Sequence, residues 1–302
     1  MRAVVFSRYG DESVLELVEL PGPRPAAGEV LLRVRAAGVN PVDWKMREGY
    51  VGTDRPFPLG LGWDVAGVVV ESAAAGGPPV GAEVYGMLPL PYGAAYQEFT
   101  AVPAAVLAPL PDGLDFERAA AVPLAALTAW QALDAAGVKG GERVLVQGGA
   151  GGVGHFAVQL AKARGAYVLA TASARNQDFL RGLGADEPLD RGAGGPYRGE
   201  PVDVVIDAVG GQVQHDSWAL LRPGGMLITL PEPLDEAYRR PGVDARRIVV
   251  APDGEALTRI GGLIEAGRVR VEVEQVLPLD RAAEAHRISA AGRVRGKLVL
   301  TL

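Results

Sequence analysis

Cysteine is absent from this chain of 302 residues, and its absence excludes disulfide bonds, thiolate nucleophiles and cysteine-ligated zinc. Histidine is scarce as well. His155, His215 and His286 lie far apart in segments that we expect to be helical, whereas zinc requires clustered ligands. The Tyr-x-x-x-Lys pair of short-chain reductases and the Gly-x-Ser-x-Gly elbow of hydrolases are also missing. Redox chemistry in this chain must therefore come from a bound cofactor.

Blocks of basic residues and long apolar runs are missing too. The net charge is −6, and the chain has no basic block that would attract nucleic acid or an anionic membrane. The most apolar stretch, Ala119–Ala132, is too short to span a bilayer and contains Pro123. The first 20 residues mix charged and aliphatic side chains and form no signal peptide. We therefore expect a cytoplasmic protein without a membrane partner or a nucleic-acid partner.

The length and the hydrophobic content of 48% suit two domains better than one. Short β-prone runs separated by glycine and proline predict a β-rich, barrel-like first domain. These runs are residues 3–6, 30–36, 65–70 and 96–100. Residues 271–276 and 297–302 are β-prone again, and we expect the chain to return to the first domain there.

From Asp112 onward, helical segments alternate with buried strands such as Val202–Asp207 and Met226–Leu230. Alternating strands and helices predict a parallel, doubly wound sheet. The predicted fold class is therefore α/β, with a β-rich domain and a doubly wound domain. We assign residues 1–115 and 247–302 to the first and residues 116–246 to the second.

The most informative stretch is Arg143–Ser173, which predicts a strand, a helix and a second strand. Gly149, Gly151 and Gly154 form a Gly-x-Gly-x-x-Gly pattern where the first strand meets the helix. Glycines in this position let the backbone turn sharply and approach a pyrophosphate, and the helix N-terminus offers free amides to the phosphates.

With 41 glycines in the chain, a purely structural turn is the alternative. The strand before the pattern and the helix and strand after it favour dinucleotide binding. The expected phosphate-binding residues are Gly149, Ala150, Gly151, Gly152, Val153 and Gly154.

The choice between NAD and NADP depends on the end of the second strand of this unit. An NAD site usually places an acidic residue there to hold the ribose hydroxyl, but no acidic residue lies between Glu142 and Asp178. Ser173 and Arg175 stand in the region instead, and an arginine can bind a 2′-phosphate through charge-assisted hydrogen bonds. These residues favour NADP(H). The alternative is that Arg175 is only a solvated surface residue.

Several stretches together resemble the quinone oxidoreductase (ζ-crystallin-like) branch of the medium-chain dehydrogenase/reductase superfamily. They cover nearly the whole chain in the right order and are residues 36–49, 61–69, 120–133, 148–154, 204–211, 220–230 and 295–300. The resemblance implies a GroES-like catalytic domain built from both chain ends, a Rossmann domain between them and an active-site cleft at their junction. It also suggests a homodimer formed through the Rossmann domain, to which residues 226–230 and 231–250 contribute.

The resemblance also indicates whether the enzyme needs zinc and which residues bind the 2′-phosphate of the cofactor. Members with catalytic zinc carry a cysteine where this chain has Asn40 and a histidine where it has Trp63, so the resemblance implies a zinc-independent enzyme without a metal site. The family commonly has a lysine at the position of Gln177 and a tyrosine at that of Arg191. Arg175 and Arg191 are therefore the candidate substitutes for binding the 2′-phosphate.

The resemblance also places candidate catalytic residues in the cleft. Asn40 and Thr128 are expected to hydrogen-bond around the nicotinamide, and Lys45 or Tyr50 to donate a hydrogen bond or a proton to the acceptor oxygen. For Asp43, a structural role as a cap or ion-pair partner is favoured.

An aromatic residue at position 63 suggests an apolar acceptor pocket. Trp63, with Tyr50 and Tyr92, would suit flat, conjugated acceptors. The alternative is that Trp63 packs in the core.

These observations lead to one functional hypothesis with two alternatives. The hypothesis is an NADPH-dependent, zinc-independent reductase that transfers hydride to quinones. The first alternative is a reductase of α,β-unsaturated carbonyls. The second is a cofactor-binding protein with a structural or RNA-binding role, against which the lack of a basic stripe counts.

Overall fold

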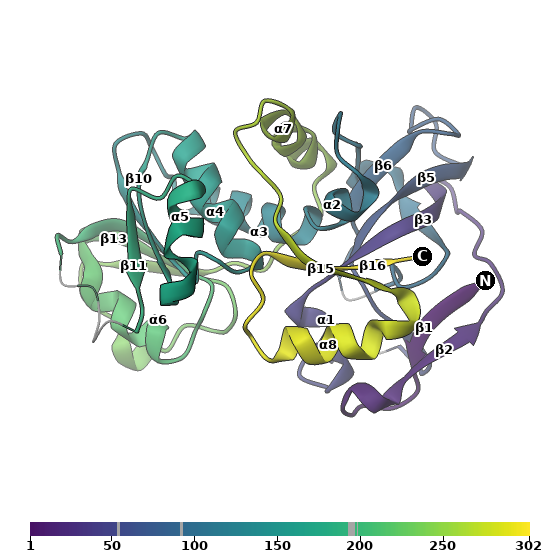
Figure 1. The fold of residues 1–302 in the computed structure, drawn as a ribbon, viewed down its shortest axis with the longest axis horizontal. Helices are drawn as coiled ribbons and strands as arrows, with labels where there is room; N and C mark the ends of the chain where they lie inside the picture. The colour runs from purple at the N-terminus through teal and green to yellow at the C-terminus, as the bar shows by residue number, and fades with distance from the viewer. Residues whose placement is uncertain (53–54, 91–92, 193–196, 198) are drawn as a thin grey trace. The chain divides into compact units, whose positions relative to one another are not determined.

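The computed structural model describes the chain from Met1 to Leu302 except residues 53–54, 91–92, 193–196 and 198. The described chain divides into two compact units (Figure 1). The first unit comprises Met1–Leu127, Ala251–Gly267 and Val271–Leu302, and the second comprises Thr128–Val250 and Arg268–Arg270.

The first unit contains two sheets. Six strands of the larger sheet follow one another in the order β15-β16-β3-β5-β6-β8, and β7 also pairs with β3. The smaller sheet has the order β2-β1-β4. The strands are β1 Arg2–Phe6, β2 Leu15–Glu19, β3 Glu29–Val39, β4 Leu59–Gly60, β5 Asp64–Ser72, β6 Glu83–Met87, β7 Phe99–Pro103, β8 Leu107–Pro109, β15 Val273–Pro278 and β16 Lys297–Thr301.

The long strand β3 organises this unit. Its residues Val30, Leu32 and Val34 alternate into the core, as the two-residue period of a strand requires. The late strand β16 pairs antiparallel with the end of β3, with Leu298 opposite Val39. Because β5 pairs with the other edge of β3, residues from three distant parts of the sequence meet where β3 ends.

Among the described residues of this unit, four α-helices accompany these sheets, besides the start of α3 (Pro123–Ala135). They are α1 Pro41–Arg47, α2 Phe116–Ala120, α7 Gly254–Glu265 and α8 Ala282–Ala290, and the short 3₁₀ turns are Glu12–Val14, Ala104–Val106 and Leu279–Arg281. Helices α1 and α8 pack side by side (Figure 1), and α2 packs on β3 and β5. This packing of α2 explains why the first unit continues past the predicted boundary at residue 115 and ends within α3, Pro123–Ala135.

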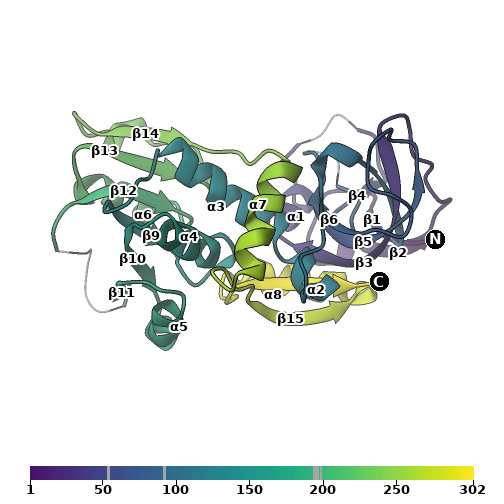
Figure 2. The same ribbon diagram turned by 90° about the horizontal axis from the view of Figure 1, so that it is seen from above.

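The second unit is built around a six-stranded sheet in the order β11-β10-β9-β12-β13-β14, and the labels follow this order across Figure 2. All of its pairings are parallel, so the predicted α/β class and doubly wound sheet are confirmed. The strands are β9 Arg143–Gln147, β10 Tyr167–Ala172, β11 Glu187–Asp190, β12 Val202–Asp207, β13 Leu221–Thr229 and β14 Asp244–Arg247.

The helices of the second unit, besides the later part of α3, are short or medium in length. They are α4 Gly152–Ala163, α5 Gln177–Gly182 and α6 Gln212–Ser217, with 3₁₀ turns at Ala174–Asn176, Trp218–Leu220 and Glu236–Tyr238. Within the described residues, no helix has the length and apolar character that crossing a bilayer requires. The strand order reverses between β9 and β12, and in such sheets ligands bind at this point, beyond the carboxyl ends of the strands.

Strand β13 differs from its prediction. The sequence predicts a helix over 212–221 that ends at Pro223-Gly224-Gly225 and a strand over Met226–Leu230, but β13 already begins at Leu221. Its pairing with β12 shifts register between Leu221 and Met226, and Gly224 has a φ of 78°. The strand therefore continues through a bulge, which glycine permits because it lacks a β-carbon.

Candidate active site

The glycine turn lies at the reversal point of the second sheet, between the end of β9 and the start of α4. Gly148 has a φ of 75°, a left-handed conformation that favours glycine. A β-carbon on Gly154 would lie 2.1 Å from the carbonyl oxygen of Gly148, so only glycine lets the helix begin so close to the turn. Gly151 is the N-cap of α4 and provides no side-chain cap. The first amides of α4 are therefore available to phosphate oxygens.

Thr171 of β10 fixes this turn from the neighbouring strand. Its hydroxyl accepts a hydrogen bond from the Gly148 amide at 3.1 Å and donates one to Gln147 Oε1 at 2.8 Å. The Gly149 amide donates to the Thr171 carbonyl at 2.8 Å. Thr171 thus has a structural role that the sequence did not reveal, because a cross-strand hydrogen bond leaves no local pattern.

Ser173, Arg175 and Arg191 gather at the carboxyl edge of β10 and β11. Ser173 follows β10 directly, Arg175 lies in the next turn with its side chain exposed, and the Arg191 amide donates to the Ala172 carbonyl at 3.0 Å. The structure therefore brings these three predicted residues to one edge, on the same side of the sheet as the glycine turn. In sheets of this kind, the ribose of a bound dinucleotide lies near the end of the second strand of the unit, which is the region that Ser173 and Arg175 occupy.

Asp190 is an acidic residue at this edge that the sequence search did not cover. It is the last residue of β11 and lies in register with Ala172 of β10. Its Oδ1 accepts a hydrogen bond from the Gly192 amide at 2.9 Å, so one carboxylate oxygen is engaged in its own turn. The edge thus offers two arginines and one partly engaged carboxylate, and this balance of charge still favours a phosphate.

Thr128 and His155 are both buried residues of the second unit. Thr128 is buried on α3. His155 is fully buried on α4, with Nδ1 at 3.0 Å from the Gly151 carbonyl oxygen. The ring of His155 also packs against Phe156, with centroids 4.0 Å apart. His155 therefore packs inside the unit and does not face a phosphate.

Asn40 begins the polar part of the first unit, directly after β3. It is the N-cap of α1, with extended backbone angles and Pro41 at the first helical position, where proline is well tolerated. Its amide donates to Asp43 Oδ2 at 2.5 Å. Asp43 thus completes a capping box with the N-cap Asn40, which agrees with the structural capping role favoured from the sequence.

Asp43 is fully buried, and it is held by few partners. Its Oδ2 also accepts a hydrogen bond from the Tyr96 hydroxyl at 2.9 Å. Its Oδ1 has no partner among the described residues. Burial raises the pKa of Asp43 to about 7, although the hydrogen bonds from Asn40 and Tyr96 oppose the shift.

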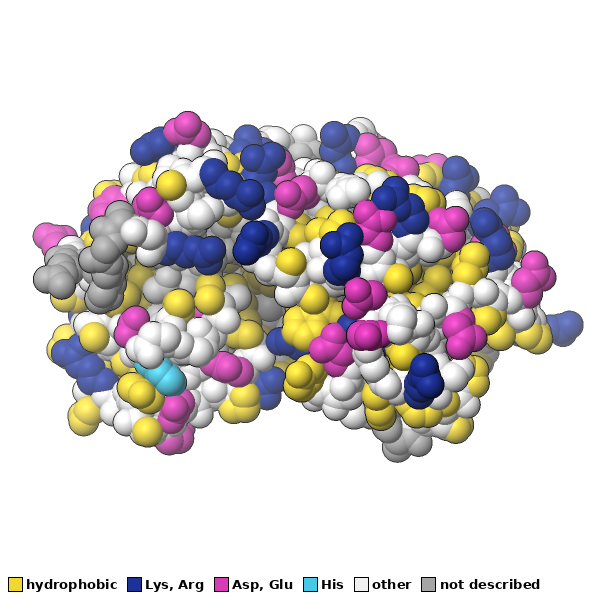
Figure 3. Space-filling model, turned by 60° about the horizontal axis from the view of Figure 1, so that its bottom comes forward, with side chains coloured by type: hydrophobic (Ala, Val, Ile, Leu, Met, Phe, Trp, Pro, Cys, Tyr) yellow, Lys and Arg dark blue, Asp and Glu magenta, His cyan; other side chains and the backbone are white. Residues whose placement is uncertain are grey.

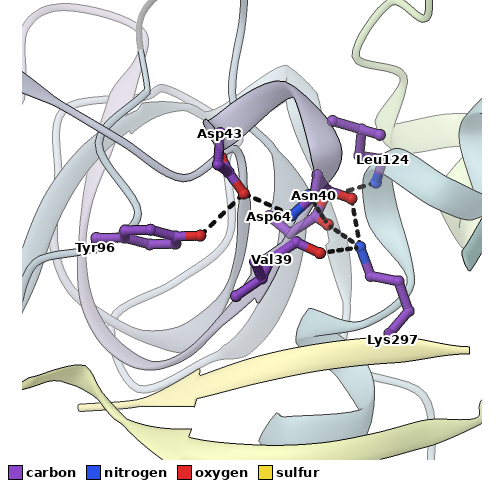
Figure 4. A network of polar contacts seen from close by, with 7 residues as sticks. All are labelled: Val39, Asn40, Asp43, Asp64, Tyr96, Leu124 and Lys297. Carbon is purple, nitrogen blue, oxygen red and sulfur yellow. Dashed lines mark hydrogen bonds and ion pairs between the residues drawn. The ribbon is translucent and has the colours of Figure 1, made fainter. Parts of the chain in front are cut away.

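The Asn40 side chain joins a buried ion pair, as Figure 4 shows. Its Nδ2 donates to Asp64 Oδ2 at 2.8 Å, and its Oδ1 accepts a hydrogen bond from Lys297 Nζ. Lys297 Nζ lies 3.3 Å from Asp64 Oδ2 and 3.1 Å from the Val39 carbonyl oxygen. Asp64 Oδ1 accepts from the Leu124 amide at 2.6 Å. The structure thus supports Asn40 with two charged residues, Asp64 and Lys297, that were not predicted as site residues.

The other predicted catalytic residues fall into two places. Tyr50 is 75% exposed, and its ring meets that of Trp44 edge-on with centroids 6.4 Å apart. Lys45 Nζ lies 5.7 Å from the Trp44 ring centroid, so Lys45, Tyr50 and Trp44 form one group. Trp63 is fully buried in the apolar core of the first unit, which is the alternative that the sequence left open. Tyr92 lies outside the described residues.

No metal-binding cluster of three or more histidine, cysteine, aspartate or glutamate side chains occurs in the part of the chain that the structure describes. At the two positions where zinc enzymes of the superfamily carry ligands, Asn40 is hydrogen-bonded to Lys297 and Trp63 packs in the core. An ammonium group beside Asn40 opposes a second cation there. The residues present do not suit a zinc ion.

Comparison with known protein families gives two matches. Residues 26–112 match the alcohol dehydrogenase GroES-like domain, and residues 183–300 match a family described as zinc-binding dehydrogenase. An NADPH-dependent alkenal/one oxidoreductase of chloroplasts from Arabidopsis thaliana is 36% identical, over 99% of this chain and 79% of that protein.

Two solved structures cover the whole chain. The quinone oxidoreductase from Coxiella burnetii superposes with a TM-score of 0.94 at 34% identity, over 100% of this chain and 99% of that one. The Escherichia coli quinone oxidoreductase complexed with NADPH superposes with a TM-score of 0.90 at 26% identity, over 100% of both chains. With both units matched in fold and sequence, this chain is an oxidoreductase that belongs to the zinc-independent quinone oxidoreductase branch of the medium-chain dehydrogenase/reductase superfamily.

Proposed function

We propose that this chain is an NADPH-dependent reductase that transfers hydride to quinones. The observation that carries the cofactor assignment is the arrangement of the glycine turn with Ser173, Arg175 and Arg191 at one edge of the second sheet. The similar Escherichia coli structure holds NADPH, and the Arabidopsis relative is named as NADPH-dependent. The second candidate acceptor, an α,β-unsaturated carbonyl, is favoured by the name of that relative.

The residues of the second unit bind and orient the cofactor. The amides of residues 149–154 hold the pyrophosphate, because the turn brings them together at the positive end of the α4 dipole. Ser173, Arg175 and Arg191 bind the 2′-phosphate, and Thr128 hydrogen-bonds near the nicotinamide. When bound, the reduced cofactor supplies the hydride.

The residues of the first unit act on the acceptor. Tyr50 is exposed and Trp44 is half-buried, and the pair provides an aromatic surface on which a flat, conjugated molecule can stack. Asn40 donates a hydrogen bond to the acceptor oxygen, and Lys45 or Tyr50 supplies the proton that this oxygen takes up after hydride transfer. Trp63 packs in the core of the first unit and is assigned no contact with the acceptor.

The proposed partners are small molecules and not nucleic acids. On the face shown in Figure 3, basic and acidic side chains are interspersed over the residues drawn in colour. A protein that binds the backbone phosphates of a nucleic acid has basic side chains clustered on one face. The mixture of charges agrees with the net charge of −6.

The test of this function is a panel of acceptors with matched arginine variants. We expect turnover of quinones and enones with NADPH, and almost none of simple alcohols with NADP⁺. The Arg175→Ala variant should bind NADPH about 10- to 100-fold more weakly, the effect of losing one charge-assisted hydrogen bond, with NADH affinity unchanged. Arg259→Ala, on the exposed face of α7, is the control and should change neither.

Two outcomes contradict the proposal. Equal dissociation constants for NADPH and NADH in the wild type would refute the cofactor assignment. Robust oxidation of simple alcohols, without reduction of quinones or enones, would refute the acceptor assignment.

A further inference from the structure

Lys297 is a buried cation whose hydrogen-bonding capacity is fully used. It lies at the start of β16, and only 3% of its surface is exposed. Its ammonium has three acceptors, the Val39 carbonyl, Asn40 Oδ1 and Asp64 Oδ2 (Figure 4). Because an ammonium carries three donors, Lys297 has none left for a substrate or a cofactor. Any effect of Lys297 on the reaction must therefore be exerted through the residues to which it is hydrogen-bonded.

The first consequence is a fixed orientation of the Asn40 carboxamide. An ammonium can only donate a hydrogen bond and an ionised carboxylate can only accept one. Asn40 Oδ1 must therefore face Lys297, and Nδ2 must face Asp64, at 2.8 Å. A flipped amide would place its N–H groups against the ammonium and its oxygen against the carboxylate. The pair of opposite charges thus selects one of the two orientations.

The second consequence concerns the remaining N–H of Asn40 Nδ2. One N–H donates to Asp64, and no acceptor for the other is found among the described residues. The positive charge of Lys297 on Oδ1 withdraws electron density from the amide, which strengthens this second N–H as a donor. Asp64 is held in turn by the Leu124 amide at 2.6 Å, so the whole arrangement is rigid.

We propose that Lys297 is a positioning residue that, together with Asp64, orients and polarises the Asn40 carboxamide so that its free N–H donates to the oxygen of the acceptor. This inference rests on the proposed function. In that reaction, hydride moves with its electron pair from the dihydronicotinamide to a carbon of the acceptor. An electron pair shifts onto the acceptor oxygen, which then takes up one proton. NADPH is oxidised to NADP⁺, and the acceptor is reduced by two electrons.

The test compares variants that keep the site neutral. Lys297→Met alone leaves the Asp64 carboxylate buried and unpaired, which endangers folding. The double variant Lys297→Met/Asp64→Asn removes both charges and keeps similar shapes. Asn40→Ala removes the amide itself. Lys162→Met, which breaks an ion pair with Asp186 on the second unit, is the control and should leave turnover unchanged.

We expect the double variant and Asn40→Ala each to lower kcat by about 10- to 100-fold, at or below the lower end of the loss of about 100- to 1000-fold on removing an oxyanion donor. The NADPH dissociation constant should stay within about twofold of the wild-type value. The triple variant, which combines Lys297→Met/Asp64→Asn with Asn40→Ala, should be no slower than Asn40→Ala. The reason is that all of these changes remove the same hydrogen bond to the acceptor. Wild-type kcat in a folded double variant, or losses that multiply in the triple variant, would overturn the proposal.

A second readout does not depend on turnover. In a ¹⁵N-correlated NMR spectrum, the two side-chain protons of Asn40 are identified by their loss in Asn40→Ala. They should exchange slowly with solvent in the wild type and rapidly in the double variant. Fast exchange in the wild type refutes the fixed orientation. If exchange is slow but no quinone or enone is reduced, the proposed function fails and the orientation by Lys297 stands.

Discussion

Replacing His286 by leucine should stabilise the first unit, and more strongly in acid than at neutral pH. His286 lies on α8 with no exposed surface, and neither ring nitrogen has a partner among the described residues. Its neighbours include the ring of Tyr96, 5.9 Å away and edge-on, and the buried guanidinium of Arg47. Burial, assisted by the charge of Arg47, lowers the pKa of His286 from 6.5 to about 3.

The magnitude follows from two effects. Removing buried polar atoms that have no partners should raise the free energy of unfolding by about 1–3 kcal/mol at any pH. In addition, a depressed pKa means that stability is fully present above pH 6.5 and is lost as the pH falls towards 3. Through His286 the wild type therefore loses on the order of 3 kcal/mol between pH 8 and pH 4. Leucine does not titrate. The excess in the free energy of unfolding of the variant over the wild type should therefore grow by this amount between pH 8 and pH 4.

The titration of Asp43 changes the free energy of unfolding with pH in the opposite direction. Its effect must therefore be separated from that of His286. The pKa of Asp43 is raised from 3.8 to about 7, so its contribution is fully present below pH 3.8 and is lost as the pH rises through 7. The wild-type curve combines both groups, but the difference between wild type and His286→Leu contains only the histidine. The same comparison in an Asp43→Asn background is the control and should give the same difference.

The assay measures urea unfolding at pH 4, 6 and 8. Because the chain has two units, a single optical signal does not assign the transition. A short deuterium pulse at one common pH, followed by mass spectrometry of the peptide that contains β3, reports the first unit alone. If His286→Leu differs from the wild type by the same free energy at pH 4 and pH 8, the histidine is not buried in its neutral form and the reasoning fails.

Three further predictions follow. Gly154→Ala should weaken NADPH binding at least about tenfold, because the new β-carbon would lie 2.1 Å from the Gly148 carbonyl oxygen. Gly262→Ala is the control, since a β-carbon there has no atom within 4 Å. An NADPH affinity of Gly154→Ala equal to that of the wild type in fluorescence titrations would contradict the expectation. Quinone reduction should survive prolonged incubation with a chelator, and parallel loss of zinc and activity would disprove metal independence. Sedimentation should show a homodimer at micromolar concentration that Arg246→Pro disrupts, because β14 is the edge strand of the second sheet; a wild-type monomer is the contrary result.

The elements of the second unit could be predicted because their signals are local. Buried parallel strands such as β9 and β12 appear as short apolar runs, and the turn after β9 carries a glycine pattern. The bulge in β13 was missed because a Pro-Gly-Gly sequence usually marks a turn between two elements. Only the pairing with β12 shows that the backbone pairs again from Met226, in a shifted register.

The site was predicted less completely because its contacts are distant in the sequence. Asn40 could be chosen from the resemblance, but Lys297 reaches it across 257 positions, and no periodicity records such a contact. Trp63 illustrates a different limit. A large aromatic residue suits both an acceptor pocket and a core, and only its complete burial decides between them. Asp190 was overlooked because it belongs to the strand beside the one searched.

The placement of β16 between β15 and β3 also has a consequence for biosynthesis. The second unit is almost continuous in sequence, from Thr128 to Val250, so it can fold on the ribosome as soon as it has emerged. The first unit cannot complete its larger sheet until β16 has been synthesised. Its earlier strands must wait during that time, and the end of β3 that β16 later pairs with, residues 36–39, is exposed to aggregation. Translation speed through the second unit should therefore affect the yield of folded protein.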